Sequence, residues 1–126
     1  MIKRQIQNKN FYLIKCQSIV EKFNECNPDI VGIDFYHKSL SDFPVGVVVF
    51  QNDKMRSLPL AITIIENVEA TTIKDMIKMV VDEFKLKKEL LWMTDNDDAQ
   101  LSAIKNNNFI PIICKFHLIK CMNDNL

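Results

Sequence analysis

A buried strand followed at once by an amphipathic helix is the feature that most restricts how this chain can fold. Residues 60–65 are rich in β-branched side chains and apolar at nearly every position, which is typical of a strand covered on both faces. After a polar break, apolar residues recur at helical spacing as far as Phe84. Thr71 or Thr72 is predicted to cap this helix, with Asp75 at the capping-box spacing. The chain therefore delivers a helix N-terminus to the carboxyl edge of a central strand.

Composition describes one ordinary globular domain, 1–126, with no bias toward a charged partner. Its 126 residues are 48% hydrophobic and 25% charged, and 16 basic residues balance 16 acidic ones. This balance favours neither nucleic acid nor an anionic membrane as a partner. No apolar run reaches the roughly 20 residues of a membrane span, and the first residues lack the apolar core of a signal peptide. We therefore expect a cytoplasmic protein.

Neither the cysteines nor the acidic residues have the spacing of a metal site. Cys16 and Cys114 fall within apolar patterns, which favours buried, reduced thiols. Asp95, Asp97 and Asp98 match a calcium loop only in composition, since its glycine and its distal glutamate are missing. We expect no metal ion.

The remaining segments predict an α/β (α+β) fold with a mixed, mostly antiparallel central sheet flanked by helices. The predicted elements are a strand at 2–6, a helix from Asn8 or Asn10 to the Asn27-Pro28 step, strands at 30–36, 45–50 and 60–65, the helix ending at Phe84, a strand at 90–93, a short helix, and a strand at 109–119. In the first helix, Tyr12 is expected on the apolar face. The 90–93 strand is expected beside 60–65 and parallel to it, because a helical crossover joins them.

This order resembles the GNAT superfamily of acyl-CoA N-acyltransferases from about Ile30 to Ile119. The best local likeness runs from Leu91 to Ala99 and resumes at Asn108-Phe109. It is similar to the family's buried strand, Asn-containing turn, short helix and Gly-Phe opening of the last strand. The resemblance implies a GNAT-like sheet whose central strand splays from its parallel neighbour, with acetyl-CoA in the gap.

The resemblance also implies which residues would hold acetyl-CoA. Pantetheine would lie along the backbone of Glu66, Asn67 and Val68, and would face Asn96. The pyrophosphate would rest on N–H groups at the start of the following helix. The residues at that helix start are Thr71, Thr72, Ile73, Lys74 and Asp75.

The expected activity is acetyl transfer to an amine of a small molecule or a protein by direct attack on the thioester. A backbone N–H near Val68 would polarise the carbonyl, and a water or Glu66 would remove the proton of the amine. Glu66 suits that role if partial burial raises its pKa. Glu66 could instead be a solvated carboxylate at the end of a strand, with no catalytic role. Thr72 and Asn96 could likewise be helix caps rather than ligands of acetyl-CoA.

Departures from the family pattern leave a second function open. The only two glycines, Gly32 and Gly46, lie outside the expected phosphate loop. Ile104 stands where the family often has a tyrosine that serves as general acid, and Asn108 stands where the family has a glycine. These differences favour a catalytically inactive binding or protein-interaction module of the same fold. A third interpretation is pairing through an exposed edge strand at 109–119, and a homodimer is a further expectation for so short a chain.

Overall fold

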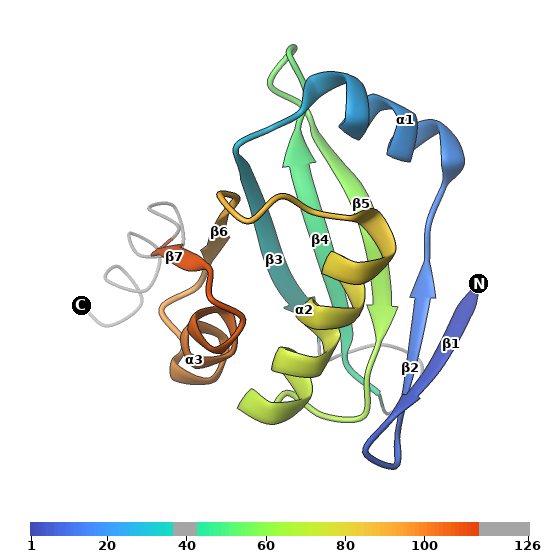
Figure 1. The fold of residues 1–126 in the computed structure, drawn as a ribbon, viewed down its shortest axis with the longest axis vertical. Helices are drawn as coiled ribbons and strands as arrows, with labels where there is room; N and C mark the ends of the chain where they lie inside the picture. Colours follow the sequence, from blue (N-terminus) through green and yellow to red (C-terminus); the bar gives the residue numbers. More distant parts are fainter. Residues whose placement is uncertain (37–42, 114–126) are drawn as a thin grey trace.

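The computed structural model describes residues 1–36 and 43–113, which form a seven-stranded mixed sheet and three helices (Figure 1). The elements are β1 (Ile2–Ile6), β2 (Lys9–Ile14), α1 (Gln17–Cys26), β3 (Ile30–Tyr36), β4 (Val45–Gln51), β5 (Ser57–Ile64), α2 (Ala70–Phe84), β6 (Leu91–Thr94), α3 (Asp98–Asn106) and β7 (Ile110–Ile113). The strand order is β1-β2-β5-β4-β3-β6-β7, and only the β3–β6 and β6–β7 pairs are parallel. The predicted α/β class with a mostly antiparallel mixed sheet is therefore confirmed. None of the described helices is both long and apolar enough to cross a bilayer.

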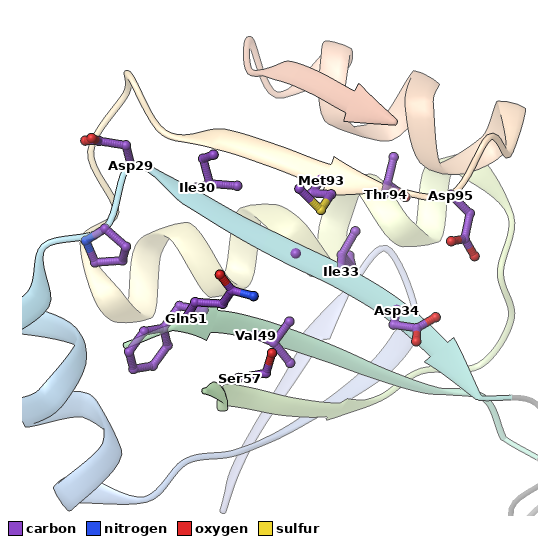
Figure 2. A pocket seen from close by; sticks show the side chains of 13 residues that line it. Asp29, Ile30, Ile33, Asp34, Val49, Gln51, Ser57, Met93, Thr94 and Asp95 are labelled. Atoms are coloured by element: carbon purple, nitrogen blue, oxygen red, sulfur yellow. The ribbon is translucent and has the colours of Figure 1, made fainter. Parts of the chain in front are cut away.

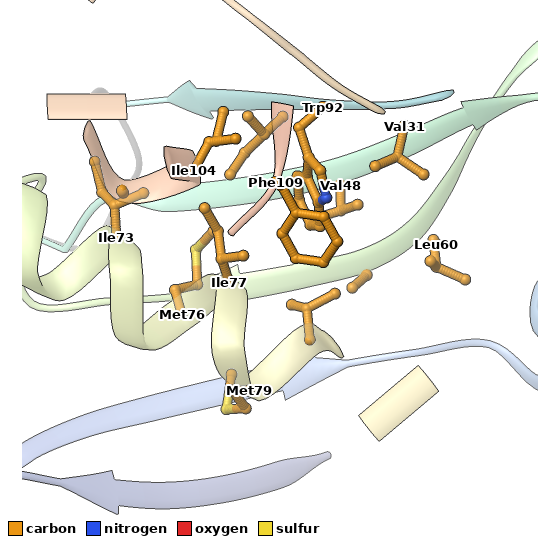
Figure 3. Packing of buried hydrophobic residues seen from close by; sticks show 14 of the residues in the cluster. Val31, Val48, Leu60, Ile73, Met76, Ile77, Met79, Trp92, Ile104 and Phe109 are labelled. Atoms are coloured by element: carbon orange, nitrogen blue, oxygen red, sulfur yellow. The ribbon is translucent and has the colours of Figure 1, made fainter. Parts of the chain in front are cut away.

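The three helices lie on one face of the sheet, where the core forms (Figures 1 and 3). The buried side chains of α2 include Ile73, Met76 and Ile77, as the helical spacing in the sequence predicts. Ile104 of α3 is fully buried in the same cluster. The Phe23 ring of α1 lies 5.2 Å from that of Phe50 on β4, so α1 covers the same face. The opposite face is covered by none of these three helices.

Close packing at Gly46 holds α2 against the sheet. The Thr63 hydroxyl donates to the Gly46 carbonyl at 2.9 Å, and the Met76 sulfur lies 3.0 Å from the same hydroxyl oxygen. A Cβ atom at Gly46 would lie 2.8 Å from the Thr63 hydroxyl oxygen, 2.9 Å from that sulfur and 2.9 Å from Phe35. No side chain fits between helix and sheet here, so glycine sets the separation of the two layers.

The expectation of a helix from Asn8 or Asn10 onward is wrong, because the chain first forms the hairpin of β1 and β2. Gln7 and Asn8 both have positive φ, 51° and 66°, which matches the tight turn that joins hairpin strands. Tyr12 therefore lies on a strand, and α1 begins only after Cys16. Cys16 is exposed rather than buried, and Cys114 lies outside the described residues.

At the other end of the chain, β7 confirms the beginning of the predicted last strand. It spans Ile110–Ile113, and the rest of the 109–119 prediction lies outside the described residues. Asp97 caps α3 by accepting from the Ala99 N–H at 3.2 Å. The left-handed Asn108 (φ 64°) follows α3, as expected for a helix stop.

The two glycines should respond differently to the same substitution. Gly46→Ala is expected to lower the free energy of unfolding by about 1–3 kcal/mol, because its new methyl would lie within 3.0 Å of atoms of the Thr63, Met76 and Phe35 side chains. Gly32→Ala is expected to change it by no more than about 0.5 kcal/mol, since its nearest neighbour is the half-buried Val49 side chain at 3.2 Å. Urea unfolding followed by fluorescence of Trp92, the only tryptophan, measures both. Equal losses in the two variants would contradict the tight contact at Gly46.

Candidate functional site

The gap expected between the 60–65 strand and the 90–93 strand is not formed, because these strands are not neighbours. β5 pairs with β2 along one edge and with β4 along the other, both antiparallel. β6 instead pairs in parallel with β3. With β4 and β3 between them, β5 and β6 lie three strand spacings apart, or about 14 Å. The predicted β5–β6 pairing is therefore wrong, and no pair of parting strands opens at residue 66.

The polar groups that follow β5 are used by the loop itself. Glu66 is exposed, and its carboxylate accepts from the backbone N–H of Asn10 at 2.5 Å. The Asn67 side chain accepts from the Glu69 N–H at 3.0 Å, and Val68 packs against the core. Glu66 thus takes the position of a solvated strand-end carboxylate that ties the loop to β2.

The start of α2 differs from the predicted anion site in its cap and its neighbours. Glu69 occupies the N-cap position, so the expectation that Thr71 or Thr72 caps the helix is wrong. Thr72 and Ile73 are fully buried, and the Lys9 ammonium of β2 donates to the Thr72 hydroxyl at 2.8 Å. The side chains of Thr72 and Ile73 are therefore part of the packed interior rather than free to contact a ligand.

Three further predicted residues lie around this segment without forming one site. Lys74 is exposed, and its carbonyl accepts from the Asn107 side chain at 3.1 Å. Asp75 is half-buried. Asn96 is exposed in the turn after β6, where Asp97 provides the helix cap. The strand order puts that turn next to the end of β3, so strand pairing does not bring Asn96 to residues 66–68.

A groove instead lies on the sheet face opposite the helices, along β3 between β4 and β6 (Figure 2). Its volume is about 590 Å³. Ile30, Val49 and Met93 form apolar walls, and Asp34 and Asp95 lie at one end. The groove is larger than a second cavity of about 110 Å³, which Phe23 and Leu86 help to line.

Glycine at position 32 makes the floor of the groove. Gly32 is in register with Val49 on β4 and with Met93 on β6, so this row of the sheet lacks a side chain at its centre. A Cβ atom at Gly32 would lie 3.2 Å from the Val49 side chain. The row is therefore hollow only because β3 carries a glycine between two larger neighbours.

The charged side chains that line the groove among the described residues are all aspartates. The Asp29 carboxylate, at the end opposite Asp34, forms an ion pair with Lys87 at 2.8 Å. One carboxylate oxygen of Asp34 accepts from the Phe35 N–H at 2.9 Å. The part of the lining that falls within residues 1–36 and 43–113 contains no lysine, arginine or histidine. The Asp34 carboxylate at this end therefore favours a positive charge.

Sequence reasoning missed this groove, although one signal for it was visible. The alternation in 30–36 already places Gly32 and Asp34 on the face of β3 that is not the core face. A glycine inside a strand often marks the close approach of a ligand or another backbone. The sequence did not indicate that β4 and β6 are the neighbours that complete the walls.

Outside the groove, the Cys16 thiol has a lowered pKa. The Ser18 hydroxyl lies 3.1 Å from its sulfur, and this hydrogen bond with the N–H groups of Ile19 and Ser18 lowers the pKa of Cys16. Within the described part of the chain, no three His, Cys, Asp or Glu side chains are grouped so as to hold a metal ion.

Comparison with known proteins assigns no family to the chain. No protein-family model matches it, and no curated protein matches it. The geometry of the groove is therefore the basis for a functional proposal.

Proposed function

We propose that the chain is a non-catalytic binding module whose groove takes a small ligand with an apolar body and a cationic end. The observation that supports this proposal is a cavity of about 590 Å³ with apolar walls and carboxylates at one end. Ligand sites typically have volumes of roughly 300–1,000 Å³, mostly apolar linings and a few polar groups that orient the ligand. The groove has all three properties.

The polar groups support a cation rather than an anion. An ammonium or guanidinium group beside the Asp34 carboxylate gains Coulomb energy. A phosphate or carboxylate at the same end would be repelled. The apolar body would lie against Ile30, Val49 and Met93, where its burial supplies most of the binding free energy.

The acetyltransferase hypothesis stays a prediction. It requires a gap beside the central strand, and here β2 and β4 pair with both edges of β5. The amine expected as acyl acceptor nevertheless has the same chemistry as the ligand proposed for the groove. The groove thus supports a binding module. It also agrees with one part of the enzyme hypothesis, namely that the chain binds an amine.

A matched series of small molecules tests the charge preference. At millimolar concentration, 2-phenylethylamine is expected to raise the melting temperature of the protein, because it binds only the folded state. The neutral analogue 2-phenylethanol should raise it less, and the anionic 3-phenylpropanoate should leave it unchanged. Differential scanning calorimetry measures the three shifts. Equal shifts for the amine, the alcohol and the acid would contradict a cation-selective groove.

Two variants test whether the ligand lies in this groove. Gly32→Val should abolish binding of the amine and of the alcohol, because its side chain fills the floor between Val49 and Met93. Asp34→Asn should reduce the affinity for the amine about tenfold, to that for the alcohol, through the loss of one charge contact. Asp53→Asn, in the exposed turn after β4, is the matched control and should bind as the wild type does. Titration calorimetry measures the affinities, and an amine affinity unaffected by Asp34→Asn would place the ligand elsewhere.

Acetyl-CoA provides the test of the enzyme hypothesis. Millimolar acetyl-CoA is expected to leave the melting temperature unchanged, because Thr72 and Ile73 are buried and β5 has no free edge. A shift that disappears in Lys74→Glu would contradict this expectation and restore the predicted phosphate contact at the start of α2.

A further inference from the structure

The polar groups of the groove lie on opposite sides of its glycine floor. Asp34 of β3 is in register with Val47 on β4, and Gly32 is in register with Val49. Gln51 stands two residues beyond Val49 on the same strand, so the floor separates it from Asp34. Residues that share a face of a strand repeat about every 6.6 Å. A carboxylate, a floor without side chains and an amide therefore follow one another along β3 at intervals of about 6.6 Å.

Gln51 brings a neutral hydrogen-bonding group to the groove. Its side chain lines the cavity, and Figure 2 shows its amide extending from β4 over the groove toward β3. Ser57, which is paired with Gln51 on β5, lines the cavity as well. An amide both donates and accepts hydrogen bonds, and so does a hydroxyl group. This end of the groove therefore suits a hydroxyl group of the ligand.

Charge compensation also favours a neutral group at the end away from Asp34. The Asp29 carboxylate, which lines that end, is paired with the Lys87 ammonium at 2.8 Å. A second cation on the ligand would have to compete with Lys87 for this carboxylate. At the other end, the Phe35 N–H donates to Asp34 at 2.9 Å and fixes the orientation of the carboxylate that receives the amine.

The floor at Gly32 suits an aromatic ring. Val49 and Met93 are in register with Gly32 on the two neighbouring strands, each about 4.8 Å from β3. A ring over the glycine backbone therefore has a β-branched side chain on one side and a thioether on the other. Figure 2 shows the Met93 sulfur on the side of β6 that faces β3. Thioether sulfur atoms make favourable contacts with aromatic rings at about 5 Å, which an alkyl chain does not provide.

We propose that the groove takes an arylethylamine with a hydroxyl group at the para position of its ring, a proposal that rests on the binding function given above. The ring lies over Gly32, the ammonium group lies beside Asp34, and the para hydroxyl hydrogen-bonds with the Gln51 amide. In such a molecule the ammonium and the hydroxyl stand at opposite ends of the long axis of the ring. Asp34 and Gln51 stand in the same way on opposite sides of Gly32.

The spacing of these groups selects a linker of two carbon atoms. With bonds of about 1.5 Å, two methylene groups carry the ammonium nitrogen about 5 Å from the ring centre. A charge-assisted hydrogen bond of about 2.8 Å then reaches a carboxylate one repeat away along β3. A linker of one carbon leaves the ammonium short of Asp34, and a linker of three carbons must fold to fit.

A series of amines tests the position of the hydroxyl group and the length of the linker. 4-(2-Aminoethyl)phenol is expected to bind about three- to tenfold more tightly than 2-phenylethylamine, which is the gain from one neutral hydrogen bond. 3-(2-Aminoethyl)phenol should bind only as well as 2-phenylethylamine, because its hydroxyl lies off the long axis. Benzylamine and 3-phenylpropylamine should bind more weakly. Titration calorimetry measures the affinities, and equal affinities for the two phenols would overturn the proposal.

Variants of Gln51 locate the hydrogen bond. Gln51→Leu should abolish the gain from the para hydroxyl and leave the affinity for 2-phenylethylamine within about twofold of the wild type. Gln51→Glu should retain the gain, because its carboxylate still accepts a hydrogen bond. Gln5→Leu, on the exposed face of the edge strand β1, is the matched control and should also retain it. Fluorescence of Trp92 confirms folding, and a gain that survives Gln51→Leu would contradict the contact.

Failure of this proposal is distinguishable from failure of the proposed function. Binding of 2-phenylethylamine that depends on Asp34 but does not improve with a para hydroxyl would overturn the phenol and keep the cation-selective groove. Failure of every amine in the series to bind would overturn both.

Discussion

Strand β5 has an antiparallel partner on each edge, and the rest of the architecture follows from that. β4 follows β3 and precedes β5 in the chain, so it pairs with both through short connections. The β1–β2 hairpin then takes the other edge of β5. Both edges of β5 are therefore occupied, and β6, which follows α2 in the chain, pairs with the outer edge of β3. The groove lies beside this added pair, and β5 stays paired along both of its edges.

The three described helices cover only one of the two faces of the sheet. Gly46 lets α2 approach the sheet until the Thr63 hydroxyl and the Met76 sulfur are in contact, and all three helices then cover the core face. None of the three described helices covers the second face. The cavity at Gly32 lies on this second face.

Periodicity predicted the elements well and their neighbours poorly. The alternation in β3 and the helical spacing in α2 are local properties, and the structure confirms both. The β1–β2 hairpin was missed because Asn8 is equally suited to cap a helix and to turn a hairpin, and its left-handed conformation has no separate signature in the sequence. The strand neighbours of β5 depend on contacts between distant segments, which no local pattern describes.

The acetyl-CoA site at residues 66–75 was inferred from the same local patterns, and it stays a prediction. The structure corrects the neighbouring strand that was expected beside it, because β6 lies about 14 Å from β5. The most direct test is therefore the strand order itself, measured by nuclear Overhauser effects between backbone protons in isotope-labelled protein. Contacts between Gly32 and Met93 are expected, because β3 and β6 are paired in parallel. Contacts between residues 60–64 and 91–94 would contradict it and reopen the gap beside the central strand.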